Sequence, residues 1–365
     1  MKLFTILFCM CCTISIEAYG KCGVDALFRQ CRTQGKCGND RISRGIPHMA
    51  ADKDSVGWPV PDGEDETVTV RKLICEGNPL FRDKYTADPA VLVRNDTLWL
   101  FAGHDNAGKQ TGYRMYDWLL YSTADMKHWT EYPVPLTIDE FAWAKSRKAY
   151  AGQVIERNGK FYWYVSTNTH GIGVAVADRI TGPYHDALGS PLLTNSDCKA
   201  SKHSWACIDP TVIIDDDGQA YLMWGNGQCY IVRLKENMTQ TEGPVTQIHL
   251  GDMFPFTEAP WIYKKDGKYY LIYASGWPEK IAYAVSDNIM GPYIPLGIIS
   301  EVAGNCNTTH PAVVEFKGRW LFFSHNGVLP EGTSYSRSVI AEDLMYNPDG
   351  TIQKIHPSSE GVKPF

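Results

Sequence analysis

The sequence predicts an all-β protein that folds as a five-bladed β-propeller. A tight turn followed by an aromatic strand recurs five times, and units of about fifty residues with three or four antiparallel strands are typical of propeller blades. Almost nothing after residue 85 carries the 3.6-residue period of an amphipathic helix. A β-sandwich is the alternative, but it does not explain the repeated turn. The first aromatic residues of the five strands are Trp99, Phe161, Tyr221, Tyr269 and Trp320.

The first part of the chain, residues 1–20, is predicted to be a signal peptide. Lys2 precedes an apolar run from Leu3 to about Ile16, and a small residue follows at Ala18. The apolar run is too short to span a bilayer comfortably, and no later segment approaches about eighteen uncharged apolar residues. We therefore expect a secreted, extracellular protein with no membrane partner. An uncleaved anchor is the alternative.

Residues 21–80 form the second predicted part, a cysteine-containing N-terminal segment with few regular elements. An even number of cysteines remains after the signal peptide, which favours disulfides in a secreted chain. We expect most pairs to form within an N-terminal and a later group of four, while the connectivity stays open. Zinc is the competing use, but no CxxC pair occurs among these cysteines. They are Cys22, Cys31, Cys37, Cys75, Cys198, Cys207, Cys229 and Cys306.

Three Asn-X-Thr triplets agree with a eukaryotic secretory route, because such triplets accept N-linked glycans. The acceptor residues are Asn95, Asn237 and Asn307. Triplets of this kind also arise by chance, so they gain weight only from their agreement with the signal peptide and the cysteines.

The charge of the chain excludes two classes of partner. The formal net charge is −6, and no cluster of lysine and arginine appears. Nucleic acids and anionic membranes both require a concentrated basic surface, so we expect neither as a partner. We expect a monomer.

Residues 81–365 form the predicted propeller domain. Each repeat has an apolar strand before its turn, and Asn-Gly, Asp-Gly or similar dipeptides join the two strands, as in a β-hairpin. The innermost strands of a propeller converge on its axis. Residues that begin these strands therefore share a central funnel at one end of the domain.

Carboxylates begin the innermost strand in three repeats. A single Asp before Pro is often only a turn residue. Three at equivalent positions would crowd one funnel mouth, where like charges raise one another's pKa, and packing alone would not select that. Glycoside hydrolysis needs a protonated acid and an ionised carboxylate, whereas a divalent cation such as Ca²⁺ is the other use of such a cluster. The residues at this position are Asp88, Asp209, Glu258 and, in the fifth repeat, His310, with Tyr150 or Gln153 in the second.

The strings KYTADPAVLV, CIDPTVIIDDDGQAYLMWGNG and FTEAPWIYKKDGKYYLIYA resemble those of glycoside hydrolase family 43, whose members are five-bladed propellers. The resemblance extends from about residue 80 to 355. It implies an inverting, single-displacement mechanism in which Asp88 is the general base and Glu258 the general acid. Asp209 would orient the acid and raise its pKa.

The same resemblance implies further site residues. His310 would lie near a central cation or its water shell, and Arg337 would contact the bound pentose. Taken alone, His310 could be a hydrogen-bonded core histidine and Arg337 a salt-bridged surface residue. Trp143 and Trp224 are candidates for a sugar-stacking wall, although buried tryptophans are common in propellers. We expect no required cofactor, with a structural Ca²⁺ at the propeller axis as the open alternative.

The run GNCNTTHPAVVEFKGRWLFFSHNG is most similar to that of arabinoxylan arabinofuranohydrolases. The resemblance implies release of α-L-arabinofuranose from arabinoxylan or arabinan, with a plant cell-wall polysaccharide or pentose oligosaccharide as the partner. A β-xylosidase or an endo-arabinanase is the alternative within the family. A sugar-binding propeller that has lost catalysis is the alternative from another class, and the intact set of three carboxylates argues against it.

Overall fold

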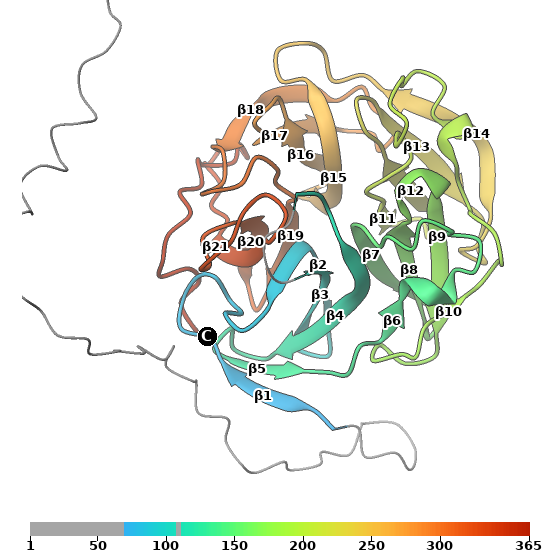
Figure 1. The fold of residues 1–365 in the computed structure, drawn as a ribbon. Coiled ribbons are helices and arrows are strands. Elements are labelled where there is room, and N and C mark those ends of the chain that lie inside the picture. Colours follow the sequence, from blue (N-terminus) through green and yellow to red (C-terminus); the bar gives the residue numbers. More distant parts are fainter. Residues whose placement is uncertain (1–68, 107–110) are drawn as a thin grey trace, which may run out of the picture. The chain divides into compact units, whose positions relative to one another are not determined.

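The computed structural model describes residues 69–106 and 111–365 (Figure 1). These residues form five antiparallel sheets arranged around an axis, which confirms the predicted five-bladed propeller. Within them the helices are three short 3-10 turns, η1 (Ile138–Glu140), η2 (Asn168–His170) and η3 (Asn195–Asp197). No helix of the described part of the chain is long and apolar enough to cross a membrane. The predicted signal peptide lies outside the described residues.

The five sheets follow one another along the chain. The first has the order β1-β5-β4-β3-β2, with β6 beside β4, the next three have four strands each, and the last has three. The sheet of the first blade therefore begins within the segment that the sequence assigns to the N-terminal part. The strands are β1 (Arg71–Ile74), β2 (Tyr85–Arg94), β3 (Thr97–Asp105), β4 (Met115–Thr123), β5 (His128–Glu131) and β6 (Leu136–Thr137) in blade 1; β7 (Gly152–Arg157), β8 (Lys160–Ser166), β9 (Ile172–Ala177) and β10 (His185–Asp186) in blade 2; β11 (Thr211–Ile214), β12 (Ala220–Trp224), β13 (Cys229–Leu234) and β14 (Thr241–Ile248) in blade 3; β15 (Phe256–Lys265), β16 (Lys268–Ser275), β17 (Lys280–Ser286) and β18 (Ile294–Ser300) in blade 4; and β19 (Ala312–Phe316), β20 (Arg319–Asn326) and β21 (Ser338–Asp343) in blade 5.

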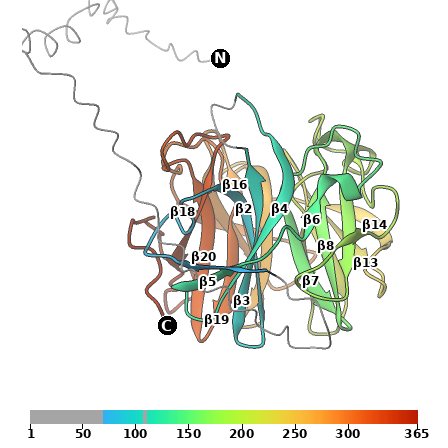
Figure 2. The ribbon, with the colours of Figure 1, turned by 60° about the horizontal axis from the view of Figure 1, so that its bottom comes forward.

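The innermost strands β2, β7, β11, β15 and β19 form a closed ring. Each contacts the next, and β19 contacts β2. Figure 2 shows the strands of neighbouring blades standing next to one another. The ring therefore brings the first residues of these strands to one end of the domain.

The turns between the first two strands of the blades take the conformation that their dipeptides predict. In four blades two residues join the strands, and both have a positive φ, for example 53° at Asn158 and 75° at Gly159. Such turns match the twist of the hairpin and favour Asn, Asp and Gly. In blade 3 the connection is longer, with residues 215–219 between the two strands, and Gly218 takes the positive φ of 83°.

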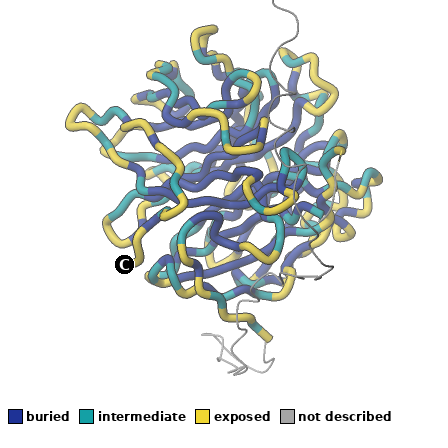
Figure 3. Tube along the Cα trace, turned by 60° about the vertical axis from the view of Figure 1, so that its left-hand side comes forward, coloured by how far each residue is buried: buried dark blue, intermediate teal, exposed yellow. Residues whose placement is uncertain are grey.

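Aromatic side chains fill the space between neighbouring blades. Trp163 of blade 2 is fully buried and meets Phe101 of blade 1 at a ring-centroid distance of 4.9 Å and Trp118 at 5.9 Å. Figure 3 shows the strands buried and the turns exposed. The aromatic repeat seen in the sequence therefore mainly builds the core between blades.

The segment before β2 closes the ring by pairing with the last blade. The side-chain amide of Asn78 accepts the N–H of Ala341 at 2.9 Å and donates to its carbonyl oxygen at 3.1 Å. Next to it, the N–H of Leu80 donates to the carbonyl oxygen of Val339 at 2.9 Å. Since blade 5 has only three strands, residues from the beginning of the domain complete its outer edge.

We expect the Asn78→Ala variant to lower the free energy of unfolding by about 2–4 kcal/mol, because it leaves buried backbone groups of Ala341 without partners. Urea denaturation would measure the change. The matched control is Asn347→Ala, since Asn347 lies in an exposed turn and bonds only locally to Thr351. Equal losses in the two variants would contradict a closing role for Asn78.

The predicted disulfides are not found among the described residues, where every cysteine has a free thiol. Cys75 and Cys229 belong to separate apolar clusters, so different blades hold them apart. Cys198 and Cys207, in contrast, lie next to each other, because their thiols are hydrogen-bonded. A disulfide between these two residues stays a prediction. Cys22, Cys31 and Cys37 lie outside the described residues.

Candidate active site

Backbone irregularities mark the places where the carboxylates enter the funnel. The pairing of β2 with β3 shifts between Ala87 and Ala90, and that of β15 with β16 shifts after Glu258. Asp88 and Asp209 have φ values of 47° and 58°. A positive φ is uncommon for residues other than glycine, and a β-bulge re-aims a side chain. The local backbone therefore turns these side chains out of the regular strand pattern.

Asp88 is buried and paired with Arg337. Its Oδ1 accepts a hydrogen bond from Nη1 of Arg337 at 2.8 Å, and its N–H donates to Nδ1 of His325 at 3.2 Å. Nδ1 of His310 lies 3.9 Å from the same Oδ1. Burial raises the pKa of Asp88, and the guanidinium of Arg337 opposes that shift. This arrangement can hold an ionised carboxylate in a site with little water.

Arg337 also binds Asp105, a residue that the sequence did not single out. Its Nε and Nη2 donate to the two carboxylate oxygens of Asp105 at 2.8 and 2.9 Å. The guanidinium lies 5.0 Å from the ring centroid of Tyr113. Only 4% of Arg337 is exposed, so its predicted contact with a pentose stays a prediction. Asp105 could have been found because it ends the aromatic strand of the first repeat at the funnel side.

Asp209 and Glu258 are linked through the backbone. Oδ2 of Asp209 accepts the N–H of Ala259, the residue after Glu258, at 3.0 Å. Burial, followed by the charges of Glu258 and Asp88, raises the pKa of Asp209 well above its ordinary value. Burial and the charge of Asp88 raise the pKa of Glu258 to about 7. The structure therefore brings Asp88, Asp209 and Glu258 together, and Glu258 can hold a proton near neutral pH.

Two further residues contact Glu258 and were missed in the sequence. Nδ2 of Asn226 donates to Oε2 of Glu258 at 2.5 Å. Glu279, which is 1% exposed, forms a side-chain hydrogen bond with Glu258. Both lie in loops that follow the aromatic strands β12 and β16, so their place at the funnel end could have been inferred from the repeat.

Among the described residues, the side chains around His310 do not supply a direct ligand set for Ca²⁺, and a cation held through its water shell stays a prediction. Burial and the charge of Arg337 lower the pKa of His310 to about 3, so the ring is neutral. Ca²⁺ prefers six to eight oxygen ligands, and the near carboxylate, Asp88, is occupied by Arg337. Within the described ranges no group of three His, Cys, Asp or Glu residues could hold a metal ion. We therefore derive no step through a cation.

The second blade places an amide, Gln153, where the other four blades place an acid or a histidine. Oε1 of Gln153 accepts the hydroxyl of Thr211 at 2.7 Å and the N–H of Val212 at 3.0 Å, which ties β7 to β11. Burial raises the pKa of Tyr150 to about 12. The charge of Arg337 opposes this rise, and the charge of Asp88 adds to it. Gln153 thus holds two blades together, and Tyr150 lies near Asp88.

Of the two candidates for the sugar-stacking wall, Trp224 lies in the core, and a sugar contact of Trp143 stays a prediction. Trp143 is half-buried and donates through Nε1 to Oδ2 of Asp186 in β10 at 2.8 Å, on the outer side of blade 2. Trp224 is fully buried, and its Nε1 donates to Sγ of Cys198 at 3.1 Å. Trp224 therefore has no face for a sugar, and Trp143 has its indole N–H directed to an outer strand.

The three acceptor residues for glycans are exposed: Asn95, Asn237 and Asn307. Asn95 lies in the turn at the end of β2 that is opposite Asp88. Asn307 lies on the side of the site, because its carbonyl oxygen accepts the N–H of Glu279 at 2.9 Å. Their glycosylation stays a prediction.

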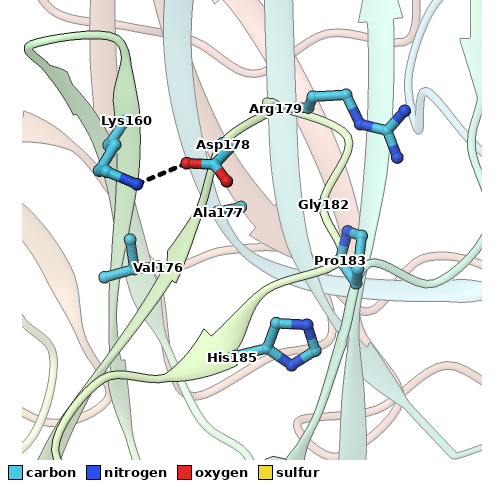
Figure 4. Close-up of a pocket in the computed structure, with 8 residues that line it drawn as sticks. All are labelled: Lys160, Val176, Ala177, Asp178, Arg179, Gly182, Pro183 and His185. Carbon is cyan, nitrogen blue, oxygen red and sulfur yellow. Dashed lines mark hydrogen bonds and ion pairs between the residues drawn. The ribbon is translucent and has the colours of Figure 1, made fainter. Parts of the chain in front are cut away.

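A separate pocket lies on the outer strands of blade 2 (Figure 4). Nζ of Lys160 donates to Oδ1 of Asp178 at 2.5 Å on its wall. Its lining includes none of the funnel residues, so it is not the candidate active site. The lining residues are Lys160, Val176, Ala177, Asp178, Arg179, Gly182, Pro183 and His185.

A propeller whose axis gathers an ion-paired carboxylate and a carboxyl group that is protonated near neutral pH belongs to the class of glycosidases that hydrolyse O-glycosyl bonds with paired carboxyl groups. Residues 77–352 match the family described as "Glycosyl hydrolases family 43", and the chain belongs to that family. The predicted resemblance is confirmed.

Known relatives cover most of the chain. A xylosidase/arabinosidase of Bacteroides ovatus is 32% identical over 327 residues, which are 76% of this chain and 96% of the relative. The crystal structure of a β-xylosidase/α-arabinofuranosidase from a compost microbial metagenome, in complex with xylotriose and in a calcium-free form, is 28% identical with a TM-score of 0.70 and covers 78% of this chain and 99% of its own. An α-L-arabinofuranosidase of Clostridium thermocellum is 32% identical with a TM-score of 0.64, and the match covers 78% and 98% of the two chains.

Proposed function

We propose that the protein is a secreted hydrolase that releases α-L-arabinofuranose from arabinoxylan or arabinan with inversion at the anomeric carbon. It is a family 43 glycosidase that acts on glycans containing arabinose or xylose. The observation that carries the proposal is the convergence of Asp88, Asp209 and Glu258 at one end of the propeller axis, with the pKa of Glu258 raised to about 7.

The proposed mechanism is a single displacement. Asp88, held ionised by Arg337, takes a proton from a water molecule as the water oxygen attacks the anomeric carbon. The bond from that carbon to the leaving oxygen breaks, and Glu258 gives its proton to the leaving oxygen. Asp88 ends protonated and Glu258 ionised until exchange with solvent restores both. Asp209 holds the backbone next to Glu258 and keeps the acid aligned.

The choice of arabinofuranose rests on the sequence resemblance and on the arabinofuranosidase among the relatives. β-Xylosidase activity is the second candidate, because a relative of similar likeness has been crystallised with xylotriose. An endo-arabinanase would use the same three carboxylates, and the loops around the funnel would decide between these activities.

The experiment that tests the proposal is incubation with an aryl α-L-arabinofuranoside, an aryl β-xyloside, arabinoxylan and linear arabinan, followed by identification of the released sugar. We expect free arabinose from the arabinofuranoside and from arabinoxylan, with the anomeric proton signal showing inversion. Xylose as the main product would favour the β-xylosidase, and arabino-oligosaccharides would favour the endo-arabinanase. The control is Asp88→Asn, which should abolish release, whereas unchanged release would contradict the assigned base.

A further inference from the structure

The carboxyl group of Glu279 lies beside the proposed acid but has no part in the mechanism described above. The segment before β19 fixes Glu279. The backbone N–H of Glu279 donates to the carbonyl oxygen of Asn307 at 2.9 Å, and its Oε2 accepts the N–H of Thr309 at 2.8 Å. These bonds hold the buried carboxyl group against Glu258, with which it forms a side-chain hydrogen bond.

Two carboxyl groups can form a hydrogen bond only if one of them carries a proton. Glu258 accepts a hydrogen bond from Asn226, and the charge of Arg337 favours its ionised form. Glu279 accepts one backbone N–H, while the adjacent cation, Lys280, pairs with Glu301 at 2.7 Å. A buried carboxylate without a cation is unfavourable, so the proton between the two groups belongs to Glu279.

We propose that Glu279 is a positioning residue that stays protonated and donates a hydrogen bond to Glu258. The proposal rests on the proposed function for the role of Glu258 as the general acid. When Glu258 gives its proton to the leaving oxygen, it becomes a carboxylate, and the hydrogen bond from Glu279 becomes charge-assisted. The bond is stronger after proton transfer than before it, which lowers the barrier to that transfer. Glu279 keeps its own proton throughout.

Two variants separate this role from simple packing. Glu279→Gln keeps a hydrogen-bond donor of nearly the same shape, whereas Glu279→Met removes the donor. We expect Glu279→Met to lower kcat about tenfold or more on glycosides with poor leaving groups, with little change in KM. Its kcat/KM should also stay high to an alkaline pH about one unit above that of the wild type, because Glu258 loses a bond that favours its ionised form. Glu279→Gln should keep both properties close to those of the wild type.

An unchanged alkaline limb in a folded Glu279→Met protein would overturn the proposal, as would equal losses in the Met and Gln variants without a shift of the limb. A second measurement does not depend on activity or on the Met variant. The infrared difference between wild type and Glu279→Gln at neutral pH should contain the C=O band of a protonated carboxylic acid. Absence of that band would overturn the proposal for Glu279 but would leave the proposed function standing. Conversely, a protein without hydrolytic activity would contradict the proposed function but would still show the band.

Discussion

The Glu258→Gln variant is expected to lose about 10²- to 10⁴-fold in kcat/KM on substrates with poor leaving groups, because glutamine cannot give a proton to the leaving oxygen. The loss should be much smaller on an aryl glycoside with a strongly acidic phenol, since that leaving group departs without protonation. Steady-state kinetics on an alkyl and a dinitrophenyl arabinofuranoside would show the difference. An equal loss on both substrates would contradict the role of general acid.

Glu236→Gln is the matched control for this change, because Glu236 is exposed in the turn after β13. It should behave as the wild type on both substrates. The wild-type pH profile gives an independent check. The pKa of Glu258 is raised to about 7, so the protonated, active form is present below that pH and is lost above it. The fall of kcat/KM above about pH 7 should be missing in Glu258→Gln.

The second large effect is expected for Arg337→Met, which should lower the free energy of unfolding by about 3–5 kcal/mol. The change leaves the carboxylates of Asp88 and Asp105 buried without their shared cation. Urea denaturation would measure the loss. The control is Arg319→Met, whose partner Asp343 is partly exposed, so the lost ion pair should cost about 1 kcal/mol or less.

Arg337→Met should also change the acid limb of the pH profile. Without the guanidinium, burial alone acts on Asp88, and its pKa rises further. The ionised base would then be lost at a higher pH than in the wild type, so the acid limb of kcat/KM should move upward. A variant with unchanged stability and an unchanged acid limb would contradict the pairing described here.

The blades and their turns were predictable because the signal is local and repeated. A dipeptide such as Asn158-Gly159 favours a positive φ at both positions, and each repeat supplies the strands on either side. Asp88, Asp209 and Glu258 were predictable for the same reason, since the repeat places them at equivalent positions. Each one alone differs little from an ordinary turn residue.

The rest of the site depends on contacts between loops that the repeat does not encode. Asn226 and Glu279 contact Glu258 from loops that each have their own length and sequence. Asp105, the last residue of β3, contacts Arg337, which lies in another such loop. The prediction for Trp224 was wrong for another reason. A tryptophan has the same sequence signal in a core and on a sugar-binding surface, so Trp224 could not be assigned to the core before its burial was seen.

The closed ring determines when, during synthesis of the chain, the candidate active site can form. Asp88 comes from the first blade, and Arg337 comes from the loop that leads into the last strand. The ion pair between these two residues therefore joins the two ends of the domain. During synthesis, Asp209 and Glu258 are made before Arg337, the partner of the proposed base Asp88. In the proposed mechanism, catalytic activity is therefore among the last properties that a newly made molecule gains, because it requires the complete domain.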